Sequence, residues 1–184
     1  MDVLSSMDAN KAVPMNDIPT KILKRFSRHL CEPLADLITE CIREGVWPDF
    51  LKIEAVTPVP KVKNMKSAND LRKICGLPNL SKVMEKIVVK YLVKDMKTKL
   101  DVCQFANQPN MSINHYLIQM VDRVLSVLDG SAKGEHTAVI ATLVDWSKAF
   151  DRQDLTLAVR SFQDNGVRNS LIPILMSFFE GRTM

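Results

Sequence analysis

Apolar residues recur every three to four positions along most of the chain, which is the spacing of one face of an α-helix. The pattern predicts helices over about 21–30, 31–44, 79–100, 112–128, 154–165 and 170–180. Thr20 fits the N-cap of the first helix, and Gly45 fits the end of the second, where glycine adopts a left-handed conformation easily. Residues 1–18 are polar and lack this spacing, so we expect a lead-in segment there.

Two other stretches have the composition of strands. Residues 53–59 are rich in β-branched side chains and are predicted to form a strand, and Pro58 and Pro60 indicate an edge strand or the end of the strand. The lysine-rich stretch 61–70 is typical of a hairpin tip, and 71–77 is predicted to be the returning strand. Residues 137–144 form a continuous apolar run, which is typical of a strand in the middle of a sheet. Together these elements predict an α+β fold.

Composition narrows the class of protein. The 184 residues, 46% hydrophobic and 25% charged, suffice for the core of one domain or a piece of a larger one. No run approaches the ~18 apolar residues of a membrane span, and the N-terminus lacks the features of a signal peptide. The four cysteines form no Cys-x-x-Cys pair and the three histidines are scattered. We therefore expect reduced thiols without a disulfide partner, no zinc site, and an intracellular protein of the nucleus or cytoplasm.

Positive charge is concentrated in residues 52–100, the basic block. This stretch holds twelve Lys or Arg and four Asp or Glu, in a chain whose net charge is only +4. Within it, Lys82, Lys86, Lys90 and Lys94 recur at every fourth position, so they form one ridge on a helix. A polyanion bound on this side is one interpretation. A solvated helix face is the other, and the lysine spacing alone favours it.

Asp145 follows directly on the apolar run 137–144. A carboxylate at the end of a buried strand lies at the rim of a sheet, where it can stay ionised and bind a cation. The alternative is that Asp145 caps the helix that follows. The strand-then-Asp pattern alone does not decide between the two.

The nine residues from Leu143 to Asp151 resemble the first catalytic motif of reverse transcriptases of non-LTR retrotransposons and group II introns, apolar-apolar-Asp-x-x-x-Ala-Phe-Asp. Four further segments are similar to motifs of this family and follow its order. The first two are Asp17-Ile18-Pro19 and Val-Thr-Pro-Val-Pro-Lys at 56–61. The third has two parts, Asp-Leu-Arg-Lys-Ile-Cys at 70–75 and Leu-Ser-Lys-Val-Met-Glu-Lys at 80–86, and the fourth is Gln-Phe-Ala-Asn-Gln-Pro-Asn-Met-Ser at 104–112. The resemblance extends over about residues 15–184, and its specificity lies in the five motifs occurring in order.

The resemblance implies a right-hand polymerase fold: a lead-in over 1–18, a fingers region over 19–111, and a partial palm over 112–184. It implies transfer of a dNTP to a DNA primer on an RNA template, with two Mg²⁺ ions held by carboxylates. Asp145 matches the family aspartate that binds both metal ions, and the backbone carbonyl of Trp146 matches the adjacent ligand.

The resemblance also assigns roles in binding. Phe150 matches the aromatic residue beneath the sugar of the incoming nucleotide, although an aromatic at this position is also typical of plain core packing. Lys61 and Arg72 match residues that reach the triphosphate. The lysine ridge, Lys82, Lys86 and Lys90 above all, and the Gln104 segment would then contact template or primer.

The sequence also departs from the family pattern. Lys73 stands where a proline is frequent, and Ala106 and Asn110 replace two glycines. The chain contains no Asp-Asp pair, although the family needs a second carboxylate motif downstream of the first. We therefore expect the chain by itself to be inactive as a polymerase. A noncatalytic nucleic-acid-binding remnant that uses the basic block is the main alternative, and a reading frame without a stable product is a third.

Overall fold

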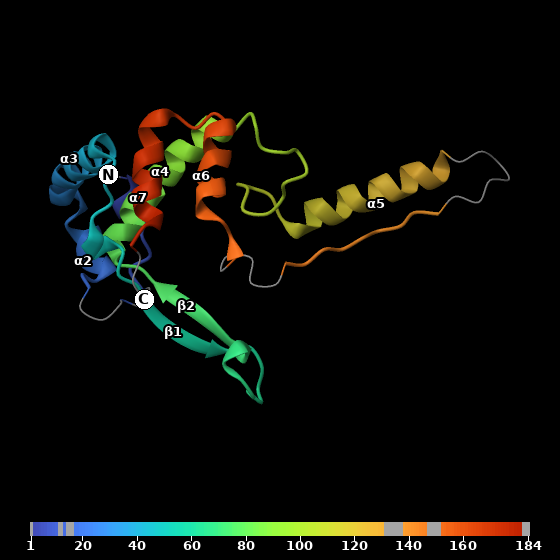
Figure 1. The fold of residues 1–184 in the computed structure, drawn as a ribbon, viewed down its shortest axis with the longest axis horizontal. Helices are drawn as coiled ribbons and strands as arrows, with labels where there is room; N and C mark the ends of the chain where they lie inside the picture. The colour runs from blue at the N-terminus through green and yellow to red at the C-terminus, as the bar shows by residue number, and fades with distance from the viewer. Residues whose placement is uncertain (1, 11–12, 14–16, 131–137, 147–151, 182–184) are drawn as a thin grey trace. The chain divides into compact units, whose positions relative to one another are not determined.

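The computed structural model describes residues 2–10, 13, 17–130, 138–146 and 152–181. The chain divides into two compact units, one of Met1–Lys97 with Asp154–Met184 and one of Thr98–Gln153. The structure is mostly helical and contains one antiparallel hairpin of two strands, which makes the fold α+β (Figure 1). The α+β prediction is confirmed at this level.

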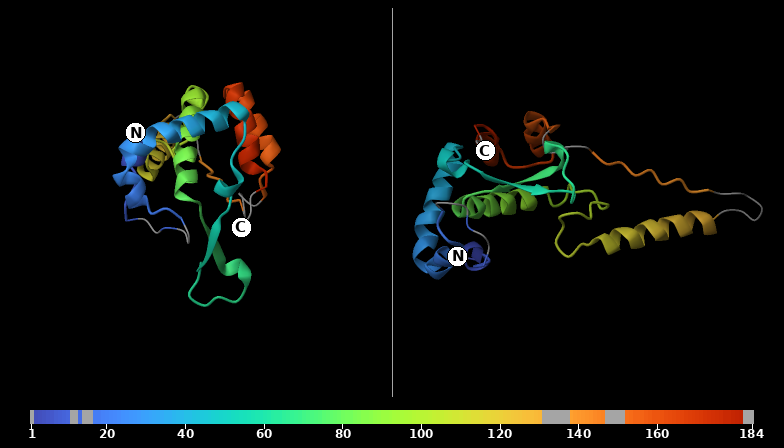
Figure 2. Two further views of the ribbon diagram at one scale, coloured as in Figure 1. Left: turned by 90° about the vertical axis from the view of Figure 1, so that its left-hand side faces the viewer. Right: turned by 90° about the horizontal axis from the view of Figure 1, so that it is seen from below.

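The first unit is built from helices that pack around α4, with the hairpin extending away from them (Figures 1 and 2). Its elements are α1 Asp2–Ser5, α2 Thr20–Arg25, α3 Ser27–Glu44, β1 Ala55–Pro60, β2 Leu71–Gly76, α4 Asn79–Met96, α6 Leu155–Asp164 and α7 Ile172–Phe179. Short 3₁₀ turns lie at Asp49–Leu51, Ala68–Asp70 and Asn169–Leu171. The core is made by apolar side chains of all the longer helices, among them Leu23, Ile38, Val83, Met84, Val88, Val159, Ile174 and Leu175.

The boundary between the first two predicted helices lies earlier than the sequence pattern indicated. The break falls at Phe26, and Pro33 lies inside α3 instead of starting a new helix. Leu30, Leu34 and Ile38 keep helical spacing across the proline and pack on the core, so burial outweighs the backbone hydrogen bond lost at Pro33. Gly45 ends α3 with a positive φ of 69°, as predicted.

The hairpin confirms the two strands predicted before and after the lysine-rich loop. Its register pairs Pro58 with Lys73, Val59 with Arg72 and Pro60 with Leu71. One step further, the backbone N–H of Lys61 donates to the carbonyl of Asp70 at 2.7 Å. The backbone N–H groups of successive residues in a strand point alternately toward the partner strand and away from it. Because the N–H of Lys61 points toward β2, the nitrogens of Pro58 and Pro60 point away from β2, where no N–H is needed for the pairing.

The N-terminal lead-in contributes to the core. Leu4 and Met7 are buried, and α1 packs against α4. Val3 also packs against the core, and these three apolar side chains of the described part of the segment are too closely spaced to give the periodic pattern from which the longer helices are predicted.

The second unit contains α5, Ile113–Asp129, and an extended segment over 138–146. A capping box formed by Ser112 and His115 starts α5, and no residue of the helix is buried. The predicted strand over 137–144 is wrong for its described part, because residues 138–144 form no strand. A strand requires a hydrogen-bonded neighbour, and the described residues of this unit provide none. Ile140 and Leu143 are consequently about nine-tenths exposed.

Among the described residues, no helix is long and apolar enough to cross a membrane. The four cysteines, at positions 31, 41, 75 and 103, form no disulfide bond with one another.

Candidate nucleic-acid interface

The hairpin brings two of the predicted phosphate-binding residues onto one face. Paired residues of an antiparallel ribbon point to the same side, and successive residues alternate between sides. Arg72 pairs with Val59, and Lys61 lies two positions beyond Val59 in the same register. Lys61 and Arg72 are therefore diagonal neighbours on one face, whereas Lys73, opposite Pro58, lies on the other.

Asp70 organises the loop that carries Lys61. Its carboxylate accepts hydrogen bonds from the backbone N–H groups of Lys66 and Ser67 at 2.9 and 3.0 Å, and it completes a capping box with Ser67. These two bonds, aided by the charge of Lys61, lower the pKa of Asp70 below its usual range. An ionised Asp70 thus fixes the backbone of the loop, a role that the sequence pattern does not indicate.

All four lysines of the ridge lie on α4, but their surroundings differ. Lys86, Lys90 and Lys94 are exposed, whereas Lys82 is half-buried. The ammonium of Lys82 donates to Oδ1 of Asn79 at 3.2 Å. Asn79 itself is buried, and two hydrogen bonds satisfy its polar groups there. Its backbone N–H donates to the carboxylate of Asp17 at 2.7 Å, and its side-chain amide donates to the carbonyl of Ile18. The Asp17-Ile18-Pro19 segment therefore holds the start of α4.

Carboxylates lie close to the ridge. Lys82 and Lys86 share a cavity of about 210 Å³ with Asp8 and Glu85. Lys90 and Lys94 line a second cavity, of about 410 Å³, together with Asp2. These acids offset part of the positive charge of the ridge, so its exposed outer side is the part best suited to phosphates.

In the second unit, Gln104 lies on the irregular segment before α5. Its side chain is exposed and donates to the carbonyl of Ala106 at 3.1 Å. With its neighbours it lines a cavity of about 530 Å³ that also includes Phe105 and Tyr116, whose rings meet edge to face at 5.9 Å. A polar amide beside two aromatic rings provides both hydrogen bonding and stacking, the two contacts that single-stranded bases use.

Asp145 and Trp146 are exposed at the end of the extended segment in the second unit. Phe150 and Asp151 lie outside the described residues. Across the part of the chain that is described, no three His, Cys, Asp or Glu side chains come close enough to hold a metal ion. Asp145 by itself provides fewer oxygen ligands than Mg²⁺ takes, and the prediction of a magnesium site stays a prediction.

The predicted residues thus fall into two groups. Lys61, Arg72, Lys82, Lys86 and Lys90 belong to the first unit, and Gln104, Asp145 and Trp146 belong to the second. Within the first unit the basic residues gather on two surfaces, one face of the hairpin and the exposed side of α4.

Comparison with known proteins links the chain to a retroelement. No family model matches the sequence. The chain is 26% identical over 181 residues to a 115 kDa protein of the type-1 retrotransposable element R1DM of Drosophila melanogaster. The alignment covers 97% of this chain and 17% of the relative, so the chain spans about a sixth of the length of that protein.

Proposed function

We propose that the chain is the fingers and first palm region of an RNA-directed DNA polymerase encoded by a non-LTR retroelement. The observation that carries the proposal is the shared face of Lys61 and Arg72, two residues whose predicted role requires that they reach one triphosphate together. The similarity to a retrotransposon protein along 97% of the chain supports the same origin.

The hairpin face is tested by a charge-matched comparison. Removal of both side chains, Lys61→Gln with Arg72→Gln, is expected to weaken binding of a dNTP with a fluorescent base by about tenfold or more, because each cation donates charge-assisted hydrogen bonds to phosphate. Fluorescence anisotropy measures the change. The matched controls are two single variants, Arg72→Gln and Lys73→Gln, because each removes one positive charge and the two residues lie on opposite faces of the hairpin. Equal losses in both proteins would contradict the assignment.

Exposed lysines on α4 supply the second part of the proposed interface. Lys86 and Lys90 project from the exposed side of the helix and would contact the backbone of an RNA template or a DNA primer. Lys82, held by Asn79, would contribute mainly by positioning the start of the ridge.

We propose that Mg²⁺ is bound in a longer protein that supplies further carboxylates. Asp145 would supply one ligand there, with further carboxylates and the carbonyl of Trp146 completing the set, and Phe150 would lie beneath the sugar. Asp145→Ala in a longer chain that polymerises is expected to abolish dNTP incorporation while leaving template binding unchanged. An Asp145→Ala protein that still extends a primer would contradict the role.

A noncatalytic nucleic-acid-binding protein is the second candidate. It is favoured by the exposed lysines Lys86, Lys90 and Lys94 on α4, which can bind phosphates without a metal ion. The two candidates agree on binding by the α4 lysines and differ on the hairpin, since a passive binder has no reason to select a triphosphate. Nucleic-acid binding without any measurable dNTP binding would favour this second candidate.

A further inference from the structure

The hairpin has two open edges. Among the described residues it is a sheet of two strands, so each strand has one edge without a hydrogen-bonded neighbour. The hairpin extends away from the helices of the first unit (Figures 1 and 2), and residues 72–75 of β2 are exposed. A strand edge of this kind presents backbone N–H and C=O groups to which another strand can add.

The edge of β1 is closed to such an addition by its prolines. Pro58 and Pro60 occupy positions whose backbone faces away from β2, because the N–H of Lys61 faces toward it. Neither proline has an N–H to donate, so a strand added along β1 would lack two hydrogen bonds. Addition is therefore directed to β2.

The edge of β2 contains no proline and keeps its hydrogen-bonding groups. By the same alternation, the backbone of Arg72 faces β1, and the backbones of Leu71 and Lys73 face away from it. The N–H of Leu71 donates to the carbonyl of Ala68. The C=O of Leu71 and both the N–H and the C=O of Lys73 bond to no described residue. One residue of an added antiparallel strand can thus exchange two hydrogen bonds with Lys73.

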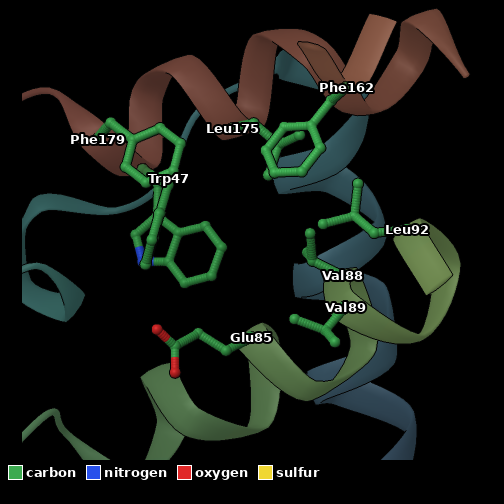
Figure 3. Close-up of a pocket in the computed structure, with 9 residues that line it drawn as sticks. Trp47, Glu85, Val88, Val89, Leu92, Phe162, Leu175 and Phe179 are labelled. Carbon is green, nitrogen blue, oxygen red and sulfur yellow. The ribbon is translucent and has the colours of Figure 1, made fainter. Parts of the chain in front are cut away.

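This edge is more selective than the apolar space elsewhere in the first unit. A cavity of about 310 Å³ between α4, α6 and α7 is lined mainly by apolar side chains, among them Trp47, Val88 and Phe162 (Figure 3). Such walls accept many apolar groups, because burial of apolar surface has no direction. The backbone groups of Lys73, in contrast, require a donor and an acceptor at fixed positions.

The side chains beside the edge have a defined order. In an added antiparallel strand, one residue would lie opposite Lys73 and the next would lie opposite Arg72. Ile74, which is 52% exposed, and Leu71, which is half-buried, flank these two basic residues. Opposite charges and apolar groups are favourable across a pair of strands. The matching order along the added strand is therefore apolar, acidic, acidic, apolar.

We propose that the edge of β2 binds an extended segment of a partner protein, of the pattern apolar-acidic-acidic-apolar, as a third and antiparallel strand. A second copy of this chain does not supply the segment, because no two Asp or Glu residues are adjacent in its sequence. The interaction does not depend on the proposed polymerase origin, because it uses only the backbone edge and the side chains of the hairpin.

The probe is the peptide Thr-Thr-Val-Glu-Glu-Val-Thr-Thr with blocked ends. It is titrated into the full chain without nucleotide while the backbone amide signals are followed by NMR. The amide signal of Lys73 should move downfield, because its N–H gains an acceptor. A peptide with lysines in place of both glutamates should bind at least about fivefold more weakly, because its charges are repelled by Arg72 and Lys73.

Methyl groups on the peptide nitrogens separate strand pairing from charge. In the proposed register the N–H of the first glutamate donates to the C=O of Lys73, and the N–H of the second points away from β2. N-methylation of the first should weaken binding about tenfold or more, because a hydrogen bond is lost and the methyl group keeps the strands apart. N-methylation of the second has the same charge and mass and should change the affinity by less than about twofold.

Two variants make the same comparison on the protein. Lys73→Gln removes the charge and keeps the N–H, whereas Lys73→Pro removes both, and the pairing with β1 does not use that N–H. The proline variant should bind the unmodified peptide at least about fivefold more weakly than the glutamine variant. If the proline variant does not fold, the two methylated peptides still decide the question, because they are tested on the unchanged chain.

Three results would overturn the proposal. The first is an unmodified peptide that leaves the Lys73 amide signal in place. The second is equal weakening by the two methyl groups, because attraction between charges without strand pairing would then explain the binding. The third is a Lys73 amide signal that moves with protein concentration in the absence of peptide, because a second copy of the chain would then occupy the edge.

Discussion

At the scale of single residues, Gly45 is required for two reasons, its left-handed backbone conformation and its close packing against α7. Its φ is 69°, and a Cβ added to it would lie 2.4 Å from Cβ of Pro173 on α7. Gly45→Ala should therefore lower the free energy of unfolding by about 2 kcal/mol or more, through both the left-handed backbone and the collision. Urea unfolding followed by circular dichroism measures the loss.

Gly166 is the matched control for this prediction. Its φ is 84°, and a Cβ there would meet nothing within 4 Å. Gly166→Ala should show the backbone effect alone, about 1 kcal/mol. Equal losses at the two glycines would mean that α7 moves away from Gly45 without penalty.

Asparagine replaces glycine in the segment before α5. The motif that residues 104–112 resemble has glycines at the positions of Ala106 and Asn110, and Ala106 in a left-handed conformation would be strained. In the structure the positive φ values fall on Asn107 and Asn110, at 58° and 60°. Asparagine tolerates this conformation better than other residues with a Cβ. The sequence could not show this, because φ values of a loop depend on contacts that have no period.

At the scale of elements, an ion pair ties α4 to the turn before α7. The guanidinium of Arg168 donates to both carboxylate oxygens of Asp95, at 2.7 and 2.5 Å, and stacks over Tyr91 at 5.1 Å. Hydrogen bonds from the Arg168 side chain, then from its backbone N–H, lower the pKa of Asp95 to about 2. The folded protein therefore holds this carboxylate ionised more strongly than the unfolded chain does.

The sign of the pH dependence follows from that shift. The pair stabilises the fold fully above the usual aspartate pKa of ~3.9, and the contribution is lost as the pH falls toward 2. The urea midpoint of Asp95→Asn should lie below that of the native protein at pH 6, and the gap should close between about pH 4 and pH 2. A gap that stays constant over this range would show that the pair does not act through ionisation.

The two long helices α4 and α5 should differ sharply in local stability. Three apolar residues of α4 are among the most buried of the chain, whereas α5 buries none. Amides of α4 should therefore exchange with solvent only on global unfolding, and those of α5 should exchange much faster through local opening. Hydrogen exchange followed by NMR tests this. Equal protection of the two helices would mean that α5 has a packing partner in solution.

Long helices and the hairpin could be predicted because their signals are local. Residues 53–77 show alternation, a polar loop and prolines at tolerated positions, and the α4 pattern repeats over several turns. The segment 138–144 could not be predicted in the same way. Its composition is that of a buried strand, but strand formation depends on neighbours that the segment itself does not encode.

The candidate site was predictable to a similar degree. The spacing of the lysines on α4 placed them on one ridge, and the strand alternation puts Lys61 and Arg72 on one face once the register is known. The hydrogen bond from Lys82 to Asn79 and the capping role of Asp70 were not predictable, because both depend on contacts specific to the folded chain.

At the scale of the whole molecule, charge is distributed between a basic block and a more acidic remainder. The block, 52–100, has a net charge of +8 in a chain of +4, and the structure displays it on the hairpin and on α4. Acids of the N-terminal segment border the α4 ridge on one side. The molecule therefore presents a limited basic surface rather than a general positive charge.

The most direct test of this account is the salt dependence of binding to an RNA–DNA hybrid, measured by fluorescence anisotropy. Lys86→Glu with Lys90→Glu should weaken binding at least tenfold and reduce the slope of log K against log salt by about two, one for each phosphate contact. Arg28→Glu with Arg160→Glu changes the net charge equally at exposed positions outside the basic block, and it should leave the slope nearly unchanged. Equal effects of the two pairs, or no effect of the first, would contradict the assignment of the α4 lysines as a nucleic-acid interface.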